Sequence, residues 1–271
     1  MYKPPVTGKK KLGLVLGCGG AQGIAHIGVL KVLEREGIRP DLIVGSSMGS
    51  IVGAAYALGK SIDEIEKFVL TYDNNAEIRG LLDLNFGKGS LVKGKKVLAS
   101  LKEFLGDTTF ADIKIPFCMS AVDLEDGEEV VLNKGSLPLC ALASCSIPGL
   151  FPPVKIEGRY LIDGGIINPT PVDIAEKMGA DIVIAVDLMM HRKFEFEKEP
   201  SIVNVLLQSY EIVRSQAIVR RLEHTSKDTI LVKPRMRGVM GTLKFYKIER
   251  FIKSGEEAAE EALPEIKKKL N

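Results

Sequence analysis

The sequence has 271 residues, of which 45% are hydrophobic and 27% charged, with a formal net charge of +2. This length and composition fit a soluble globular protein with a substantial core, and the small net charge gives no support for nucleic-acid binding. The apolar stretches also fall short of the roughly 20 residues that a membrane span needs.

The cysteines and histidines argue against a metal site. The four cysteines form no C-x-x-C pair, and the three histidines are scattered, so free thiols in a reducing compartment and no cofactor are expected. Lys9–Lys11 and the apolar run before Cys18 imitate a lipoprotein signal, but the run of six residues is shorter than the roughly 7–15 of an export segment. A cytoplasmic protein is therefore predicted.

The first part of the chain alternates apolar segments, Gly-rich turns and helical patterns. Residues 11–16 predict a buried strand and residues 24–36 a helix. A second strand over 42–44 leads into Gly45-Ser46-Ser47-Met48-Gly49, after which an Ala-rich helix begins. A repeated strand, turn and helix predicts the right-handed parallel unit of an α/β sheet.

The rest of the chain continues this alternation. Ser61 and Glu64 have the spacing of a capping box that opens a helix to about Tyr72. Residues 73–94 are irregular and are interpreted as either a packed loop or a mobile apolar lid. Helices are expected over 95–105, 137–144, 171–178, 202–223 and 256–270, and strands over 117–121, 130–132, 182–186 and 229–232, with a hairpin over 154–162 turning at Glu157-Gly158.

No linker divides the sequence, so a single domain over residues 1–271 is predicted. A short tail of residues 1–10 precedes the part that carries the motifs, about 11–190, and a helical part follows over about 201–271. The fold class is α/β, with a mainly parallel central sheet flanked by helices.

The pentapeptide Gly45–Gly49 has the pattern G-x-S-x-G of a nucleophile elbow. Such an elbow holds its serine in a tight turn between strand and helix, where backbone crowding requires small flanking residues. The pattern selects Ser47, because Ser46 occupies its variable position. The alternative is a Gly/Ser turn in which Ser46 or Ser47 caps the helix.

A second Gly-rich turn spans residues 17–23, Gly17-Cys18-Gly19-Gly20-Ala21-Gln22-Gly23. A dinucleotide fingerprint would need a glycine at Gln22 and an acidic residue where Gly45 ends the second strand, and the Gly-Lys-Ser/Thr ending of a phosphate loop is missing. The small residues suit an anion cradle of converging backbone N–H groups, with a tight structural turn as the alternative. At the carboxyl edge of one parallel sheet, this cradle could receive the oxyanion formed when Ser47 attacks a carbonyl.

A serine nucleophile also needs a base. In the order that α/β-hydrolases use, the candidates are Ser47, an acid at Asp163 or Asp187, and His224. Asp163 ends an apolar strand and precedes Gly164-Gly165, so its backbone can approach another turn closely; a plain Asp-Gly turn is the alternative. Of the other histidines, His26 in the first helix is interpreted as a packing or supporting residue. His191 is interpreted as part of a charged loop.

Three motifs in this order resemble the patatin-like phospholipase and esterase family. They are the segment Leu14–Leu30, which contains the Gly-rich turn, then Gly45–Gly49, then Asp163-Gly164-Gly165. The similarity continues through Asn168–Val172 and Gly179–Asp187, so that it covers about residues 11–190.

The resemblance implies a three-layer patatin-like fold and a Ser–Asp dyad without a histidine. Ser47 would be the nucleophile that forms an acyl-enzyme, and Asp163 the base that accepts its proton and later activates water. The N–H groups of Gly19 and Gly20 would form the oxyanion hole, flanked by Cys18. The positions expected to support these residues are Gln22, Gly45, Gly49, Gly164 and Gly165.

Two positions depart from the family pattern G-G-G-x-R/K-G. Cys18 replaces the first glycine, and Gln22 replaces the basic residue. The lost positive charge beside the oxyanion site weakens the case for a phospholipid head group, although Gln22 can still donate hydrogen bonds.

The leading hypothesis is a serine acyl hydrolase that cleaves carboxyl esters of lipids or fatty-acyl compounds, with no metal and no nucleic-acid partner. Two alternatives stay open: a non-catalytic or weakly active lipid-sensing protein on the same scaffold, and a Ser-His-Asp hydrolase that uses His224. Basic and apolar residues alternate over Lys233–Lys247, which indicates either a peripheral membrane contact or a solvated basic face.

Overall fold

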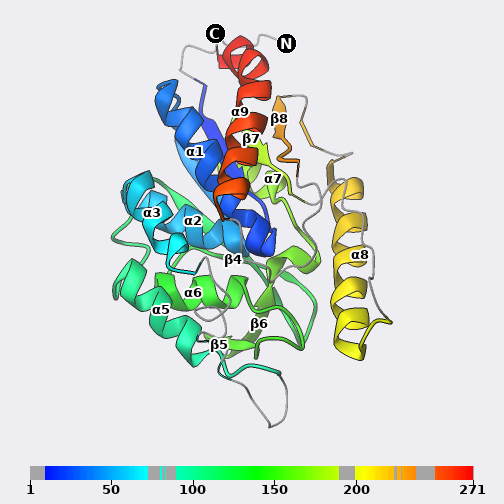
Figure 1. Ribbon diagram of the computed structural model, residues 1–271. Helices are drawn as coiled ribbons and strands as arrows, with labels where there is room; N and C mark the ends of the chain where they lie inside the picture. The colour runs from blue at the N-terminus through cyan, green and yellow to red at the C-terminus, as the bar shows by residue number, and fades with distance from the viewer. Residues whose placement is uncertain are drawn as a thin grey trace, which may run out of the picture.

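A mixed β-sheet forms the middle layer of the protein (Figure 1). The structure is a computed structural model, and it describes residues 10–72, 80, 83, 90–188, 199–222, 225–226, 228–235 and 248–270. Within these residues the sheet has eight strands, in the order β5-β6-β3-β2-β1-β7-β8 with β4 beside β3. The strands are β1 (Leu12–Leu16), β2 (Leu42–Ser46), β3 (Phe117–Asp123), β4 (Glu129–Leu132), β5 (Val154–Ile156), β6 (Arg159–Asp163), β7 (Ile182–Val186) and β8 (Thr229–Val232).

The sheet is parallel in its centre and antiparallel at one end. The strands β3, β2, β1, β7 and β8 run parallel to one another. The strands β4 and β6 both run antiparallel to β3, and β5 runs antiparallel to β6. The expected mainly parallel sheet is thus confirmed, with an antiparallel extension beyond β3.

Helices cover both faces of the sheet. The helices are α1 (Ala25–Arg35), α2 (Met48–Ala57), α3 (Ile62–Leu70), α5 (Lys95–Leu105), α6 (Leu137–Ser144), α7 (Val172–Lys177), α8 (Ile202–Leu222) and α9 (Ile248–Leu270), with the 3₁₀ turns η1 (Gly20–Ile24) and η2 (Gly164–Ile166). The helices α1, α2 and α9 share one hydrophobic core with Leu14 and Leu16 of β1, whereas α7 packs in a second core with Val15. These cores make the three layers that the sequence predicts.

Local patterns explain several of the element boundaries. Ser61 and Glu64 form the predicted capping box, in which the Glu64 N–H donates to Ser61 Oγ at 3.2 Å and the Ser61 N–H donates to Glu64 Oε2 at 2.8 Å. The hairpin of β5 and β6 turns at Glu157 and Gly158, both with positive φ, 49° and 88°. That backbone matches the twist of a two-residue hairpin loop.

The C-terminal helix is longer than the sequence predicts. A start at Glu256 is wrong, because α9 begins at Ile248 and continues through Gly255. Gly255 lies where α9 crosses α1: a Cβ there would overlap the carbonyl oxygen of Ala25. A Cβ on Gly28 would likewise overlap the carbonyl oxygen of Ile252. Gly255 therefore permits a close crossing of two helices and does not end one.

Some predicted features fall outside the described residues. No helix that the structure describes is both long and apolar enough to pass through a membrane. The single domain over 1–271 stays a prediction. Outside the description lie most of the irregular segment 73–94, the histidines His191 and His224, and residues 236–247 of the basic segment.

Candidate active site

The ends of β2 and β6 bring the predicted nucleophile and base together. Ser46, just before Ser47, pairs with Ser120 of β3, and Asp163 pairs with Ala121, the next residue along β3. The hydroxyl of Ser47 donates a hydrogen bond to Asp163 Oδ2 at 2.8 Å. Two residues that are 116 positions apart thus meet because β3 pairs with Ser46, the neighbour of Ser47, on one side and with Asp163 on the other.

Ser47 has the strained backbone of an elbow between β2 and α2. Its φ of 55° and ψ of −125° place a non-glycine residue in a region that side chains disfavour. The flanking glycines leave room for this turn, since a Cβ on Gly45 would lie 2.6 Å from the Cα of Ser50, and one on Gly49 would overlap the carbonyl oxygen of Leu16. The steric need for small residues at these two positions is therefore met in the fold.

The alternative role of Ser47 as a helix cap is not what the structure shows. Ser47 occupies the N-cap position of α2, but its side chain makes no capping hydrogen bond. Its backbone N–H donates to Ser144 Oγ at 3.0 Å, and the hydroxyl of Ser144 donates to the carbonyl oxygen of Ser120 at 2.7 Å. The hydroxyl of Ser50 donates to the carbonyl oxygen of Ser47 at 2.6 Å. The hydroxyl of Ser47 therefore bonds to Asp163, while its backbone N–H and carbonyl groups bond to Ser144 and Ser50.

Sequence reasoning missed the supporting roles of Ser144 and Ser50. Ser144 is the last residue of α6, which is predicted as a helix without any function. Its only sequence signal is a polar residue at the end of an apolar helix, and the relation to Ser47 depends on how α6 packs against β3.

Asp163 is a fully buried carboxylate at the end of β6. Its Oδ1 accepts a hydrogen bond from the N–H of Gly165 at 2.7 Å. Burial raises the pKa of Asp163 above its usual value, while the charge of Arg214 and the hydrogen bond from Ser47 oppose this rise. A Cβ on Gly164 would lie 2.5 Å from the carbonyl group of Ser120, so this position needs a glycine for the close approach to β3.

The Gly-rich turn contacts the elbow. Gly23, in η1, packs so closely on Met48, the first residue of α2, that a Cβ would overlap its side chain. The N–H groups of Gly17 and Cys18 donate to the carbonyl oxygens of Val186 at 3.1 Å and Pro169 at 2.8 Å. Gly20, one of the two expected oxyanion-hole residues, has a φ of +55°, which favours glycine.

The residues around this turn are tightly enclosed. A Cβ on Gly19 would lie 2.5 Å from Leu188 Cδ1 and 3.0 Å from the backbone nitrogen of Gly23. Gln22, which stands where the family pattern has a basic residue, is buried at 4% exposure. His26 has its Nε2 2.7 Å from the carbonyl oxygen of Gly17, and burial lowers its pKa to about 4. A neutral His26 that holds the turn agrees with its predicted packing or supporting role.

Asp187, the other candidate acid, is buried directly after β7. The hydrogen bond of the Ser47 hydroxyl goes to Asp163, so the described geometry pairs the nucleophile with Asp163. Within the described part of the chain, no three acidic, His or Cys residues are grouped as metal ligands.

One charged residue near the site was not predicted. Arg214, from the middle of α8, is completely buried and donates hydrogen bonds to Glu211 and to the Sγ of Cys18. Arg214 is separated from Cys18 by 196 positions, and no motif joins them.

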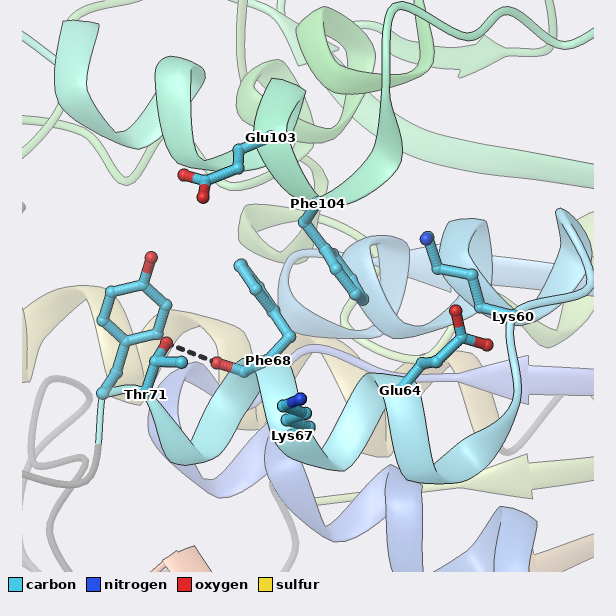
Figure 2. A pocket seen from close by; sticks show the side chains of 8 residues that line it. Lys60, Glu64, Lys67, Phe68, Thr71, Glu103 and Phe104 are labelled. Atoms are coloured by element: carbon cyan, nitrogen blue, oxygen red, sulfur yellow. Dashed lines mark hydrogen bonds between the residues drawn. The ribbon is translucent and has the colours of Figure 1, made fainter.

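A surface hollow lies elsewhere, between α3 and α5. Figure 2 shows the side chains that line it, among them the rings of Phe68 and Phe104, which stack with centroids 3.8 Å apart. Lys60 lies over the ring of Phe104, with Nζ 5.2 Å from its centroid. None of the predicted site residues lines this hollow, so it is separate from the pair formed by Ser47 and Asp163.

Comparison with known proteins identifies a matching family model and relatives that are similar over about two thirds of this chain. The family model described as patatin-like phospholipase matches residues 14–176. An uncharacterized NTE family protein of Mycobacterium tuberculosis is 35% identical over 178 residues, which are 66% of this chain and 49% of that protein. The human patatin-like phospholipase domain-containing protein 6 is 36% identical over 181 residues, 65% of this chain and 13% of that protein.

The chain thus spans about half the length of the mycobacterial relative it matches. Among solved structures, VipD from Legionella pneumophila has a TM-score of 0.52 and 14% sequence identity, with 95% of this chain and 67% of that chain covered. This likeness supports the three-layer fold alone. Because the family model matches more than half of the sequence, the chain belongs to the patatin-like phospholipase family.

Proposed function

We propose that the protein is a serine acyl hydrolase that cleaves carboxyl esters of lipids or fatty-acyl compounds. The observation that carries this proposal is the hydrogen bond of 2.8 Å from the Ser47 hydroxyl to Asp163, made at a strained elbow. A serine held in this way is aimed at a base and is kept from the ordinary role of a helix cap. Strain at such a position is typical of functional sites.

In the proposed reaction, Ser47 Oγ attacks the ester carbonyl while its proton passes to Asp163. The tetrahedral intermediate collapses with release of the alcohol, which takes up the proton that Asp163 holds, and leaves an acyl group on Ser47. Asp163 then accepts a proton from a water molecule, whose oxygen attacks the acyl group. Collapse of this second intermediate frees the carboxylic acid, and the proton on Asp163 passes to Ser47 Oγ. A carboxylate is a weak base for a hydroxyl, so positioning and oxyanion stabilisation must supply much of the rate.

The oxyanion is proposed to bind at the backbone N–H groups of Gly19 and Gly20. The positive φ of Gly20 and the contact between Gly23 and Met48 support this role, because they bring an unusual Gly-rich backbone against the elbow. Removal of one such donor typically costs about 2.7–4 kcal/mol of transition-state stabilisation.

The lipid or acyl-ester substrate is proposed from the family. Two relatives bear the names lysophospholipase, in Aspergillus fumigatus, and patatin-like phospholipase domain-containing protein, in humans. Each relative is matched over only 12% or 13% of its own length, so the substrate of this chain is a proposal about the shared catalytic part. A peripheral membrane contact through Lys233–Lys247 is proposed with it, and liposome binding at low salt tests that contact separately.

The function is tested with p-nitrophenyl acyl esters and a fluorophosphonate probe. The wild type should hydrolyse the ester and be labelled at Ser47, whereas Ser47→Ala should lose both properties. Ser46→Ala is the matched control, because it removes the neighbouring buried hydroxyl, and it should keep both. Undiminished hydrolysis by Ser47→Ala or Asp163→Asn would refute the proposed dyad.

The same experiment separates the alternatives. A lipid-sensing protein would bind acyl chains without labelling at Ser47. A triad would lose activity in His224→Ala and keep it in Asp163→Asn. The hydrogen bond between Ser47 and Asp163 favours the dyad.

A further inference from the structure

Arg214 is a fully buried arginine, which is unusual unless its charge is paired. Its Nη1 donates to Glu211 Oε1 at 2.9 Å, and its Nη2 donates to the Sγ of Cys18. The ring of Tyr210 lies 4.9 Å from the guanidinium carbon. The helix α8 thus buries the charged side chains of Glu211 and Arg214, and the guanidinium of Arg214 contacts Cys18 in the Gly-rich turn.

Cys18 connects Arg214 to the proposed dyad. It directly precedes Gly19 and Gly20, so a contact on its side chain bears on the backbone that is proposed to bind the oxyanion. A Cβ on Gly165 would lie 2.9 Å from Cys18 Sγ and 3.0 Å from Asp163 Oδ1. The thiol of Cys18 and the carboxylate of Asp163 therefore both border the backbone of Gly165, with the guanidinium of Arg214 hydrogen-bonded to the thiol.

The charge of Arg214 also acts on Asp163 through space. Arg214 lowers the pKa of Asp163, against a burial effect that raises it, and Glu211 on the same helix raises it further. Burial, together with the charge of Asp163, raises the pKa of Cys18 to about 12 and also raises those of Cys145 and Tyr210, so that these three groups are neutral at neutral pH.

We propose that Arg214 is a positioning residue for the proposed hydrolase, on which this inference rests. Through Cys18 it fixes the turn that carries Gly19 and Gly20, and through its charge it favours the ionised form of Asp163 that accepts the proton of Ser47. The basic residue that the family pattern has at Gln22 is absent here, and Arg214 brings a positive charge to the same turn from a different part of the chain.

A merely structural role for Arg214 would be to hold α8 against the body of the protein. That role predicts a loss of folded protein without a change in the pH dependence of the reaction. The proposed role predicts a change in that pH dependence, because an acidic limb in kcat/KM reports the ionisation of the essential base in the free enzyme.

The test measures kcat/KM against pH for p-nitrophenyl ester hydrolysis in the full chain. Arg214→Gln should lower kcat/KM about tenfold at neutral pH and move the acidic limb to higher pH, because it removes the opposite charge that favours ionised Asp163. Arg214→Lys should keep the limb near its wild-type position. Glu211→Gln should move the limb in the opposite direction, to lower pH, and it decides the question if Arg214→Gln does not fold.

Ile218→Ala is the matched control on α8. Ile218 is 1% exposed and lies one turn beyond Arg214, so its truncation loosens the helix without changing a charge. It should leave the acidic limb where the wild type has it. An equal shift in Ile218→Ala, or unshifted limbs in Arg214→Gln and Glu211→Gln, would overturn the inference.

The two proposals fail in different ways. If the wild type hydrolyses the ester and depends on Ser47 and Asp163, but the limbs stay unshifted, only the role of Arg214 is wrong. If the wild type neither hydrolyses esters nor reacts with the probe, the proposed function is wrong and the role of Arg214 is wrong with it.

Discussion

The segment from β1 to α2 and the helix α8 bury opposite kinds of residue. From β1 to α2 the buried positions are mostly apolar or small, and glycines stand where backbones meet, as Gly49 does against Leu16. The buried face of α8 instead holds Glu211 and Arg214 beside Ile218, while Leu206 is 64% exposed. Figure 1 shows α8 along one side of the molecule, outside the helices that cover the sheet.

This difference separates two ways of building a site. The first segment places Ser47 by rigid packing, so its residues serve the core and the proposed chemistry together. The exposed aliphatic side chains of α8 contribute little packing energy. Its buried charged residues instead act on the site, since Arg214 contacts Cys18 and its charge lowers the pKa of Asp163. The comparison indicates that the groups proposed to react are held by the core, while their electrostatic environment comes from a separate helix.

The largest effect is expected for the buried base. Asp163→Asn should lower kcat/KM about 1,000-fold, since a positioned base typically contributes about 10²–10⁴-fold. The variant should nevertheless be at least as stable as the wild type at neutral pH. Because burial raises the pKa of Asp163, the folded protein binds this proton more tightly than the unfolded chain does, and Asp163 destabilises the fold as the pH rises through that range.

Urea unfolding at acidic and mildly alkaline pH checks this expectation beside the rate measurement. The stability advantage of Asp163→Asn should grow as the pH rises from the usual pKa of 3.8 toward the raised one. A variant that loses stability most at alkaline pH would show that Asp163 is held mainly by favourable contacts in its charged form.

The motifs around Ser47 and Asp163 are predictable because the same short segment carries both the reactive residue and the small residues that its turn requires for steric reasons. Gly45 and Gly49 must be small for the elbow to form, so the sequence records the turn that Ser47 requires. Parallel pairing brings Ser47 to the carboxyl edge of the sheet beside β3, whereas Asp163 reaches β3 on the antiparallel strand β6, which the motifs do not specify.

The rest of the site could not be predicted, for reasons of tertiary packing. Ile202, Leu206 and Val213 of α8 recur at helical spacing, so periodicity alone would place them inward. The structure exposes all three and buries Arg214 instead. Gly255 is similar. A glycine inside a helix costs about 1 kcal/mol relative to alanine, so the sequence alone favours a helix that begins after Gly255. The roles of Arg214 and Gly255 both depend on tertiary contacts, with Cys18 and Ala25 respectively.

The second prediction is that α9, like the segment from β1 to α2, affects the stability of the fold and, unlike α8, does not affect the charge around the site. Gly255→Ala should destabilise the protein by about 2–3 kcal/mol, because the added Cβ overlaps the backbone of Ala25 and must separate α1 from α9. Chemical denaturation measures this change. The acidic limb of kcat/KM should stay at its wild-type position, since no charge is altered.

A control on the same helix is Glu257→Ala. The side chain of Glu257 is 63% exposed, and its contact with Lys253 is a surface ion pair at 4.0 Å, so the change should stay within about 0.5 kcal/mol. Equal losses of stability in the two variants would mean that the close crossing with α1 is unimportant.

The third prediction concerns His26, which is buried in the first segment as a neutral ring. Its pKa is lowered to about 4 from 6.5, so the unfolded chain binds a proton that the folded protein excludes. Stability should therefore fall as the pH drops below 6.5, by about 1.4 kcal/mol for each pH unit until the folded pKa is reached. In His26→Gln this acid-dependent loss should be smaller, as urea unfolding across that pH range would show. An unchanged pH slope would assign the loss to other groups.

The smallest effect is expected on the outer face of α8. Leu206→Ser should change the free energy of unfolding by no more than about 0.5 kcal/mol, because a side chain that is 64% exposed loses little packing. Ile218→Ala, on the inner face at 1% exposure, should cost about 2 kcal/mol or more by leaving a cavity. Thermal or urea unfolding of the pair measures the asymmetry of the helix directly. A large loss in Leu206→Ser would show that the outer face is packed, and the contrast between α8 and the first segment would then be one of charge placement alone.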